Sequence, residues 1–575
     1  MKIRFARVAL AATLLVFGSA AWAGDHVFDS SFDDHAEGPW SDADAARFLT
    51  QATFGPTLDE IARLRRMGYN AWLADQAAQP SSHERSYMED QAAAGLDVYQ
   101  NSRQEAWWLH AINGPDQLRQ RIAFALSELF VVSDQNGDIE GQPIATAAYY
   151  DLLVDNAFGN YRSLLGQVTL SPVMGHYLSM FKNRKPDALE NIRPDENYAR
   201  EIMQLFSIGL LRLNADGTLL MSAGQPVPTY NQDTIRGFAH VFTGWNWANC
   251  PRTDGGQWWE WEWCPPGPVD WPDPGWNASW FLPMQAWESY HASAEDKQLL
   301  DYPGVSLPSG LLAGGGSAAS DLSAALDNIF QHPNVGPFIA RHLIKRLVTS
   351  NPSPAYIGRV AARFANNGLG VRGDLGATVR AVLMDAEARQ LPSLAGNAGK
   401  LREPLLRQSH LWRAMHAASN DGRYREWYAD YYLGQAALRS PTVFNFFLPD
   451  YSPPGELSSL GLSAPEFQIT TDTTVASVAN ALDSKTFWAW RGNPWMDPED
   501  VVIDLDAELA FANDPVRLID RYDLLFMSRT MSSSMFNILV SHVQGMDNAD
   551  TDDRRQRVQD AIWLIQTSPE YAIER

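Results

Sequence analysis

The sequence predicts a mainly α fold: a large multi-helical body with a small β-hairpin and a tryptophan-rich irregular excursion. Three observations indicate this class. Helix-start signals recur along the chain, and apolar residues follow one another at three- and four-residue steps over long stretches. One segment breaks the pattern, because ten of the 21 tryptophans fall between Trp245 and Trp287 among Pro, Gly and Asp.

Local signals place the first helices and the hairpin. Ser41 and Thr57 are each followed three residues later by a carboxylate, which is the spacing of an N-terminal capping box. Apolar spacing predicts a helix over 115–130, and Pro194 in a first helical position predicts another over 194–209. The run Asn214-Ala215-Asp216-Gly217 between apolar residues predicts a hairpin near 211–221.

The N-terminus has the zones of a signal peptide. A basic start precedes an apolar run from Val8 to Ala20 and a small-residue cleavage site that ends at Ala23. The run, about 13 residues long, is shorter than the roughly 20 that span a membrane, and no later stretch reaches that length without charges. We therefore expect cleavage after Ala23, a flexible leader over 24–40, a periplasmic or secreted protein and no integral membrane segment.

Beyond the leader, the sequence divides into three regions. A helical region over 41–244 contains the predicted hairpin, the excursion covers 245–290, and a second helical region over 291–575 is expected to pack on the first as one continuous body. The formal net charge of −23 repels phosphate backbones and anionic lipid, which excludes nucleic acid as a partner. A hydrophobic content of 45% indicates a folded protein.

The two cysteines, Cys250 and Cys264, lie in the excursion. In an oxidising compartment such a pair favours a disulfide, because zinc would need two further soft ligands nearby. A pair of free thiols stays the alternative. No metal site is expected. Asp134 to Glu140 begins like a calcium loop, but Ile139 stands where the sharp turn needs glycine, which excludes an EF-hand. We interpret the stretch as an ordinary polar loop, with a looser calcium site as the alternative.

Several blocks of the chain resemble one bacterial family, the large exported proteins grouped as domain of unknown function 1800. The most specific block is Asp195 to Glu201. The others are Arg47–Thr57, Arg119–Ser133, Pro194–Gly209, Thr243–Trp245, His291 with Lys297, His332–Pro333, Lys400–Pro404, Ser440–Phe447 and Ala464–Ile469. The resemblance implies an α-rich secreted or periplasmic protein, commonly encoded beside a partner of the domain of unknown function 1501 family, which resembles sulfatases. It implies no reaction, and Phe206 stands where many relatives have histidine.

The stretch 196–201 concentrates ionisable side chains. Asn197 and Glu201 are four residues apart and share a helix face, as do Glu196 and Arg200. In a functional interpretation Glu201 is a general acid or base with Glu196 as the second carboxylate, while Asn197 and Arg200 bind substrate.

A structural interpretation of the same stretch is the alternative. In it, Glu196 complements the helix dipole, and Glu201 and Arg200 form ion pairs with Arg119 or Arg121 of a neighbouring helix.

Candidate residues of the excursion and the loop that follows it complete the predicted site. His291 and Lys297 suit acid–base work and charge stabilisation. Trp245 and Trp247 are candidate substrate-binding residues, because exposed indoles stack on sugars and other flat ligands. The alternative is that most tryptophans form a small aromatic core.

These residues give two hypotheses of different classes. The first is a hydrolase-like enzyme that acts on a cell-envelope or extracellular polymer, with no cofactor identified. The second is a non-catalytic glycan- or protein-binding or assembly factor that works with a partner of the 1501 family. Zincin, P-loop and nucleophile-elbow motifs are missing from the sequence, which excludes those enzyme classes.

Overall fold

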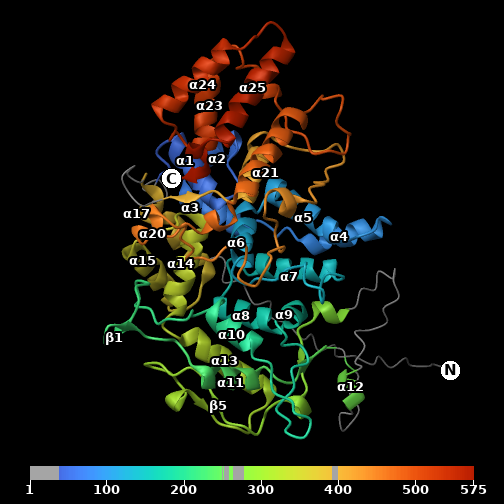
Figure 1. Cartoon of the computed structure of the whole chain (residues 1–575), viewed down its shortest axis with the longest axis vertical. Coiled ribbons are helices and arrows are strands. Elements are labelled where there is room, and N and C mark those ends of the chain that lie inside the picture. Colours follow the sequence, from blue (N-terminus) through green and yellow to red (C-terminus); the bar gives the residue numbers. More distant parts are fainter. Residues whose placement is uncertain (1–37, 249, 251–257, 263–277, 392–398) are drawn as a thin grey trace, which may run out of the picture.

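The computed structural model describes residues 38–248, 250, 258–262, 278–391 and 399–575, and it is mainly α, as predicted (Figure 1). The predicted signal peptide and residues 24–37 of the predicted leader lie outside these ranges. Within them, no helix is both long enough and apolar enough to cross a membrane.

The capped helices at the N-terminal end are confirmed. Helix α1 (Asp42–Ala52) begins at Ser41, whose hydroxyl accepts from the backbone N–H of Asp44 at 3.1 Å, and the Asp44 carboxylate accepts the Ser41 N–H at 3.0 Å. Helix α2 (Leu58–Met67) is capped by the Thr57 hydroxyl alone, which accepts from the Glu60 N–H at 3.1 Å, and it ends at Gly68. Helix α3 (Tyr69–Ala78) follows directly.

Many of the helices pack in groups along the long axis of the molecule (Figure 1). One group is α4 (Glu84–Ala93), α5 (Gln100–Asn113), α6 (Gln117–Ser127) and α7 (Pro143–Asp155). Below it lie α8 (Tyr161–Leu170), α9 (Pro172–Tyr177), α10 (Asn197–Gln204), α11 (Gln232–Val241) and α13 (Ala318–Gln331). A third group is α14 (Val335–Leu347), α15 (Pro354–Ala365) and α16 (Leu375–Met384). At the upper end lie α23 (Pro515–Met527), α24 (Ser533–Gly545) and α25 (Thr551–Gln566).

The remaining helical elements complete the described part of the fold. They are α12 (Trp258–Glu262), α17 (Ala386–Arg389), α18 (Pro404–Ala414), α19 (Ala429–Tyr432), α20 (Glu456–Ser459), α21 (Asp472–Asp483), α22 (Asp506–Leu509), α26 (Pro569–Ala572), η2 (Ala278–Phe281), η3 (Glu288–Tyr290), η4 (Pro308–Gly310), η5 (Pro465–Ile469) and η6 (Ser484–Trp488).

Contacts between early and late segments tie the described chain together. Helix α1 packs against α23, and α5 packs against α18. A single cluster of buried apolar side chains contains residues from Ala45 to Tyr571. The first and last helices therefore share one core.

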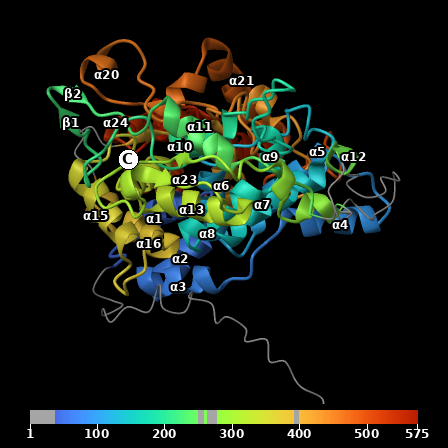
Figure 2. The ribbon, with the colours of Figure 1, turned by 90° about the horizontal axis from the view of Figure 1, so that it is seen from below.

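Paired strands in the described ranges are short and antiparallel, with two residues in each strand. The pairs are β1 (Met221–Ser222) with β2 (Gln225–Pro226), β3 (Trp245–Asn246) with β4 (Gln285–Ala286), β5 (Lys297–Gln298) with β6 (Leu311–Leu312), and β7 (Lys400–Leu401) with β8 (Ile573–Glu574). The predicted hairpin turn is present, since the Asn214 N–H donates to the Thr218 oxygen at 2.8 Å. The chain then makes the β1–β2 pair, which projects from one edge of the body (Figure 2).

Two sequence-based predictions about local structure were wrong. The helix predicted from Pro194 begins at Asn197, because the Asn183 side chain bonds both the N–H and the carbonyl of Asp195 and holds that residue outside the helix. The excursion over 245–290 is not wholly irregular: its described part contains α12, η2, η3 and the β3–β4 pair. That pairing closes the two ends of the excursion on each other.

Gly237 tests the packing of α11 on β5. A Cβ at this position would lie 2.0 Å from the main-chain oxygen of Gln298. We expect Gly237→Ala to lower the free energy of unfolding by at least about 1–3 kcal/mol through overpacking, measured by urea denaturation. Gly545→Ala is the matched control, since a Cβ at this helical glycine meets nothing within 4 Å. Equal stability of the two variants would contradict the packing described here.

Candidate functional site

The predicted polar residues of α10 lie near its start. Arg200 Nη2 lies 3.3 Å from Glu196 Oε2, the expected pair one turn apart, and Gln232 Nε2 donates to the same carboxylate at 2.9 Å. Asn197 is exposed. Glu201 is buried, and burial raises the pKa of its carboxyl while Arg200 opposes the rise. Its Oε2 has no hydrogen-bond partner among the described residues.

The structural interpretation was wrong about Arg119 and Arg121, because their partners are main-chain oxygens. Arg119 donates to main-chain oxygens of α7 and α3 at 3.3 and 3.2 Å. Arg121 donates to the main-chain oxygen of Arg346 at 2.7 Å. Helix α6 packs on α7 and α14. Its arginines therefore bond these helices and α3, and within the described chain neither forms an ion pair with Glu201. The expected pairing of Arg200 with these arginines was wrong on charge alone, because two guanidinium groups repel each other.

His291 and Lys297 come together, but at a buried carboxylate. Lys297 Nζ lies 2.8 Å and His291 Nε2 lies 3.1 Å from Asp321 Oδ2, and these side chains are at most 2% exposed. The other ring nitrogen of His291 faces the main-chain oxygen of Thr243 at 3.0 Å. Protein groups thus occupy the polar atoms of this triad, which supports a structural role in joining β5, α13 and the end of α11.

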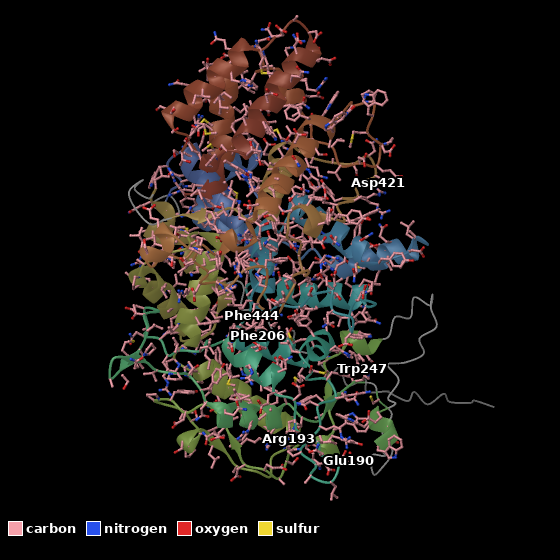
Figure 3. The ribbon with its side chains drawn as sticks, viewed as in Figure 1. Glu190, Arg193, Phe206, Trp247, Asp421 and Phe444 are labelled. Atoms are coloured by element: carbon pink, nitrogen blue, oxygen red, sulfur yellow. The ribbon has the colours of Figure 1, made fainter. Side chains whose placement is uncertain are left out.

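Trp245 and Trp247 are each 4% exposed. The Trp247 ring packs against Trp280, with ring centroids 4.8 Å apart, and it lies well away from the middle of the molecule (Figure 3). Trp245 and Trp247 therefore belong to an aromatic core and do not line a cleft, whereas Trp258 of α12 is exposed. Cys250 is buried beside it, whereas Cys264 lies outside the described residues, so the disulfide stays a prediction.

A cavity of about 120 Å³ lies between the end of α6, one face of α14, η5 and the loop over 443–450. Phe444 on this loop lies near the middle of the molecule (Figure 3). Apolar side chains form most of the wall: Leu129, Val131, Leu205, Leu213, Phe338, Val443, Phe444, Phe447, Leu448, Pro449 and Pro465. The ionisable residues of the wall are Glu128, Arg341, His342, Lys345, Arg346, Asp450 and Glu466. We call this cavity the Glu128 cavity.

Glu128 follows the last residue of α6 in an apolar stretch, so the fold buries its carboxyl. Arg346 Nε lies 3.4 Å from Oε2, an ion-pair distance without hydrogen-bond geometry, and Asn445 Nδ2 donates to Oε1 at 3.3 Å. Burial raises the pKa of Glu128 to about 8, and the charge of Arg346 is the main opposing effect. At neutral pH the carboxyl is therefore mostly protonated.

Behind the cavity, Lys400 links two further carboxyls. Its Nζ lies 3.4 Å from Glu403 Oε1 and 3.5 Å from Glu466 Oε1, and it donates to the main-chain oxygen of Arg346 at 2.9 Å. Burial alone would raise the pKa of Glu403, but Lys400 and Arg346 bring it below its usual value. Burial raises the pKa of Glu466. The site thus combines protonated and ionised carboxyls, the pattern of an acid–base centre.

Two basic residues of α14 complete the wall. His342 Nε2 faces the main-chain oxygen of Ala125 at 2.9 Å and so carries the proton, which leaves Nδ1 as an acceptor. Burial, helped by Arg346, lowers the pKa of His342 to about 3, so the ring is neutral. Burial also lowers the pKa of Lys345 to about 8, although its Nζ lies 2.8 Å from Asp450 Oδ1.

These residues were missed as site candidates from the sequence. Four blocks of the family resemblance meet at this cavity and carry Glu128, Lys400, Glu403, Asn445 and Glu466. The available signal was an ionisable residue inside an apolar run, as in Leu126-Ser127-Glu128-Leu129-Phe130, because such residues are rarely buried without a partner or a function.

Asp321→Asn tests the structural role of the buried triad. It leaves the Lys297 ammonium buried without an anionic partner, so we expect a loss of about 3–5 kcal/mol in the free energy of unfolding by chemical denaturation. Asp327→Asn on the same helix is the control, because Asp327 is 59% exposed in its pair with Arg162 and should change stability by at most about 1 kcal/mol. A well-tolerated Asp321→Asn would show that the triad does not hold the fold.

Glu128→Gln tests the raised pKa. Below pH 4.5 the carboxyl is protonated in both folded and unfolded chains, whereas between pH 4.5 and about 8 only the folded chain retains the proton. Wild-type stability should therefore fall relative to the variant as pH rises through this window, by at most about 5 kcal/mol. Melting temperatures at pH 5, 7 and 9 measure the difference, with the exposed Glu456→Gln of α20 as control. A constant difference across pH would show that Glu128 has an ordinary pKa.

The family model described as "Protein of unknown function (DUF1800)" matches residues 47–573, nearly the whole chain. No curated protein and no solved structure matches the chain significantly. The four blocks that meet at the Glu128 cavity all lie inside the matched range. The chain belongs to the family of proteins of unknown function DUF1800.

Proposed function

We propose that this chain is an exported enzyme of hydrolase type and that its acid–base chemistry takes place in the Glu128 cavity rather than at Glu201 or His291. The observation that carries the proposal is that Glu128 and Lys345, both with a pKa of about 8, line one apolar-walled cavity. A catalytic acid or base works best when its pKa lies near the working pH.

We assign roles in the reaction to Glu128, Arg346 and His342, which line the cavity together. Protonated Glu128 donates its proton to the leaving group as the bond to it breaks. Arg346, at 3.4 Å, then stabilises the carboxylate that remains. Nδ1 of neutral His342 accepts a hydrogen bond from the attacking water and orients it. As the water attacks, one of its protons returns to the Glu128 carboxylate and the other stays on the new hydroxyl group.

The cavity limits what can react. Its volume is only about 120 Å³. A chain end or a side group of an envelope or extracellular polymer fits, whereas an internal polymer segment does not. The substrate is therefore a terminal or branching group.

Hydrolysis of a chromogenic panel tests the proposal. The probes are nitrophenyl esters, glycosides, phosphates and sulfates, compared between wild type and Glu128→Gln. We expect at least one probe to be turned over, with kcat/KM lower in the variant by about 10²–10⁴. Because the acid must be protonated, the wild-type rate should fall as pH rises through about 8. Turnover that survives the substitution would place the chemistry elsewhere.

The assembly hypothesis has one observation in its favour. Phe444 and Leu448 at the mouth of the Glu128 cavity are 43% and 42% exposed. An apolar side chain of a partner, such as a protein of the 1501 family, would insert between them. This function predicts no turnover of the panel together with a complex of the two purified proteins in size-exclusion chromatography, which Phe444→Ala weakens.

A further inference from the structure

Exposed tryptophans gather at one place outside the Glu128 cavity. Trp488 is 58% exposed and Trp495 is 85% exposed. They line an open groove of about 630 Å³ with Trp490, Phe487, Asn493, Pro494, Asp483, Asp552 and Arg555. This placement contrasts with that of Trp245, Trp247 and Trp287 in the tryptophan-rich excursion, which are buried, while Trp258 of α12 is 61% exposed. We call this surface the tryptophan groove.

The fold holds these rings outward. Helix α21 ends at Asp483 and continues as a π-helical turn, η6, over Ser484–Trp488. Such turns are rare and occur often at functional sites, because the wider turn redirects the side chains that follow. Trp488 is the last residue of this turn. A π-helical turn that continues α21 therefore places Trp488 in the groove.

The loop after η6 is fixed by hydrogen bonds. Asn493 Nδ2 donates to the Trp488 carbonyl at 2.6 Å, and Asn493 Oδ1 accepts from the Trp495 N–H at 3.1 Å. The Arg491 N–H donates to the Ile503 oxygen at 2.9 Å. These bonds keep the two exposed indoles in place without using their rings, and within the described chain no ring contact covers Trp488 or Trp495.

Polar groups stand beside the rings. Asp483 has no hydrogen-bond or ion-pair partner among the described residues. Asp552 pairs with Arg555 at 2.8 Å, and the Arg555 guanidinium lies 3.9 Å from the centre of the Trp490 ring. Flat apolar faces thus alternate with carboxylates that accept hydrogen bonds.

This alternation matches one class of ligand. Sugar rings present C–H faces that stack on indoles and hydroxyl groups that donate to carboxylates. Nucleic acid and anionic lipid do not fit, because the free carboxylate in the groove and the net charge of −23 repel phosphate. A small apolar ligand would need an enclosed pocket, whereas this groove is wide and open.

We propose that the tryptophan groove binds a neutral polysaccharide, with Trp488 and Trp495 stacking on successive sugar rings and Asp483 accepting from their hydroxyls. This proposal is independent of the chemistry at the Glu128 cavity, because the two surfaces share no residue.

Affinity electrophoresis in native gels tests it. The probes are hydroxyethyl cellulose, glycol chitin and dextran, and the full chain is compared with Trp488→Ala/Trp495→Ala. We expect at least one glycan to slow the wild type, and the double variant to bind that glycan about tenfold or more weakly, which is about 1.4 kcal/mol. Trp40→Ala is the matched control, because Trp40 is 69% exposed and lies outside the groove.

Each outcome decides the proposal. Retardation of the double variant equal to that of wild type would overturn it, as would no retardation of wild type by any of the three glycans. Concentration-dependent self-association without glycan binding would assign the groove to a protein contact instead. Should the double variant fail to fold by circular dichroism, the single Trp495→Ala, at the more exposed ring, gives the same comparison. Glu128→Gln should keep wild-type retardation, which separates this test from that of the proposed enzyme.

Discussion

The structure depends on one buried carbonyl oxygen, that of Arg346, and on the charges around it. Arg121 Nη2 and Lys400 Nζ both donate to this oxygen, at 2.7 and 2.9 Å. Lys400 then reaches Glu403 and Glu466, and the Arg346 side chain reaches Glu128. Burying so many charges is costly unless every partner is in place. The segments that supply them must therefore come together for any of them to be stable.

The same constraint produces the chemistry of the Glu128 cavity. Apolar walls remove water, and without water a carboxyl retains its proton unless a cation compensates. Glu403 accepts hydrogen bonds from Lys400 and Gln435. Glu128 accepts one from the neutral amide of Asn445 and lies at ion-pair distance from Arg346 without hydrogen-bond geometry. Burial therefore raises the pKa of Glu128, whereas Lys400 and Arg346 bring that of Glu403 below its usual value. A core that must bury charge for its stability thus generates a protonated acid beside an ionised carboxylate.

Local structure could be predicted from the sequence where the signal was itself local. Ser41 and Thr57 cap helices because their hydroxyls bond backbone groups three residues away. The start of α10 could not be predicted, because it depends on the side chain of Asn183, which lies outside the helix in the sequence but bonds Asp195 just before it. The sequence placed His291 and Lys297 close to each other, and they do lie together. Their common partner Asp321 comes from a later helix, so the sequence did not indicate that the three side chains form a buried triad. Convergence of Glu128, Lys400 and Glu466 is a property of the tertiary fold and has no counterpart in residue spacing.

Tryptophan count alone was equally uninformative about binding. The set around Trp247 is buried with Met284 and packs against Phe181 in an aromatic core, whereas Trp488 and Trp495 are exposed on a loop that hydrogen bonds hold in place. The two proposed sites depend on opposite properties. Exclusion of water perturbs the carboxyls of the Glu128 cavity, and exposure leaves indole faces open in the tryptophan groove. A polymer binds along an open groove, whereas a small reacting group must be buried in a dry cavity. One surface would not meet both needs. This is a physical reason for the chain to have the two proposed sites at different places.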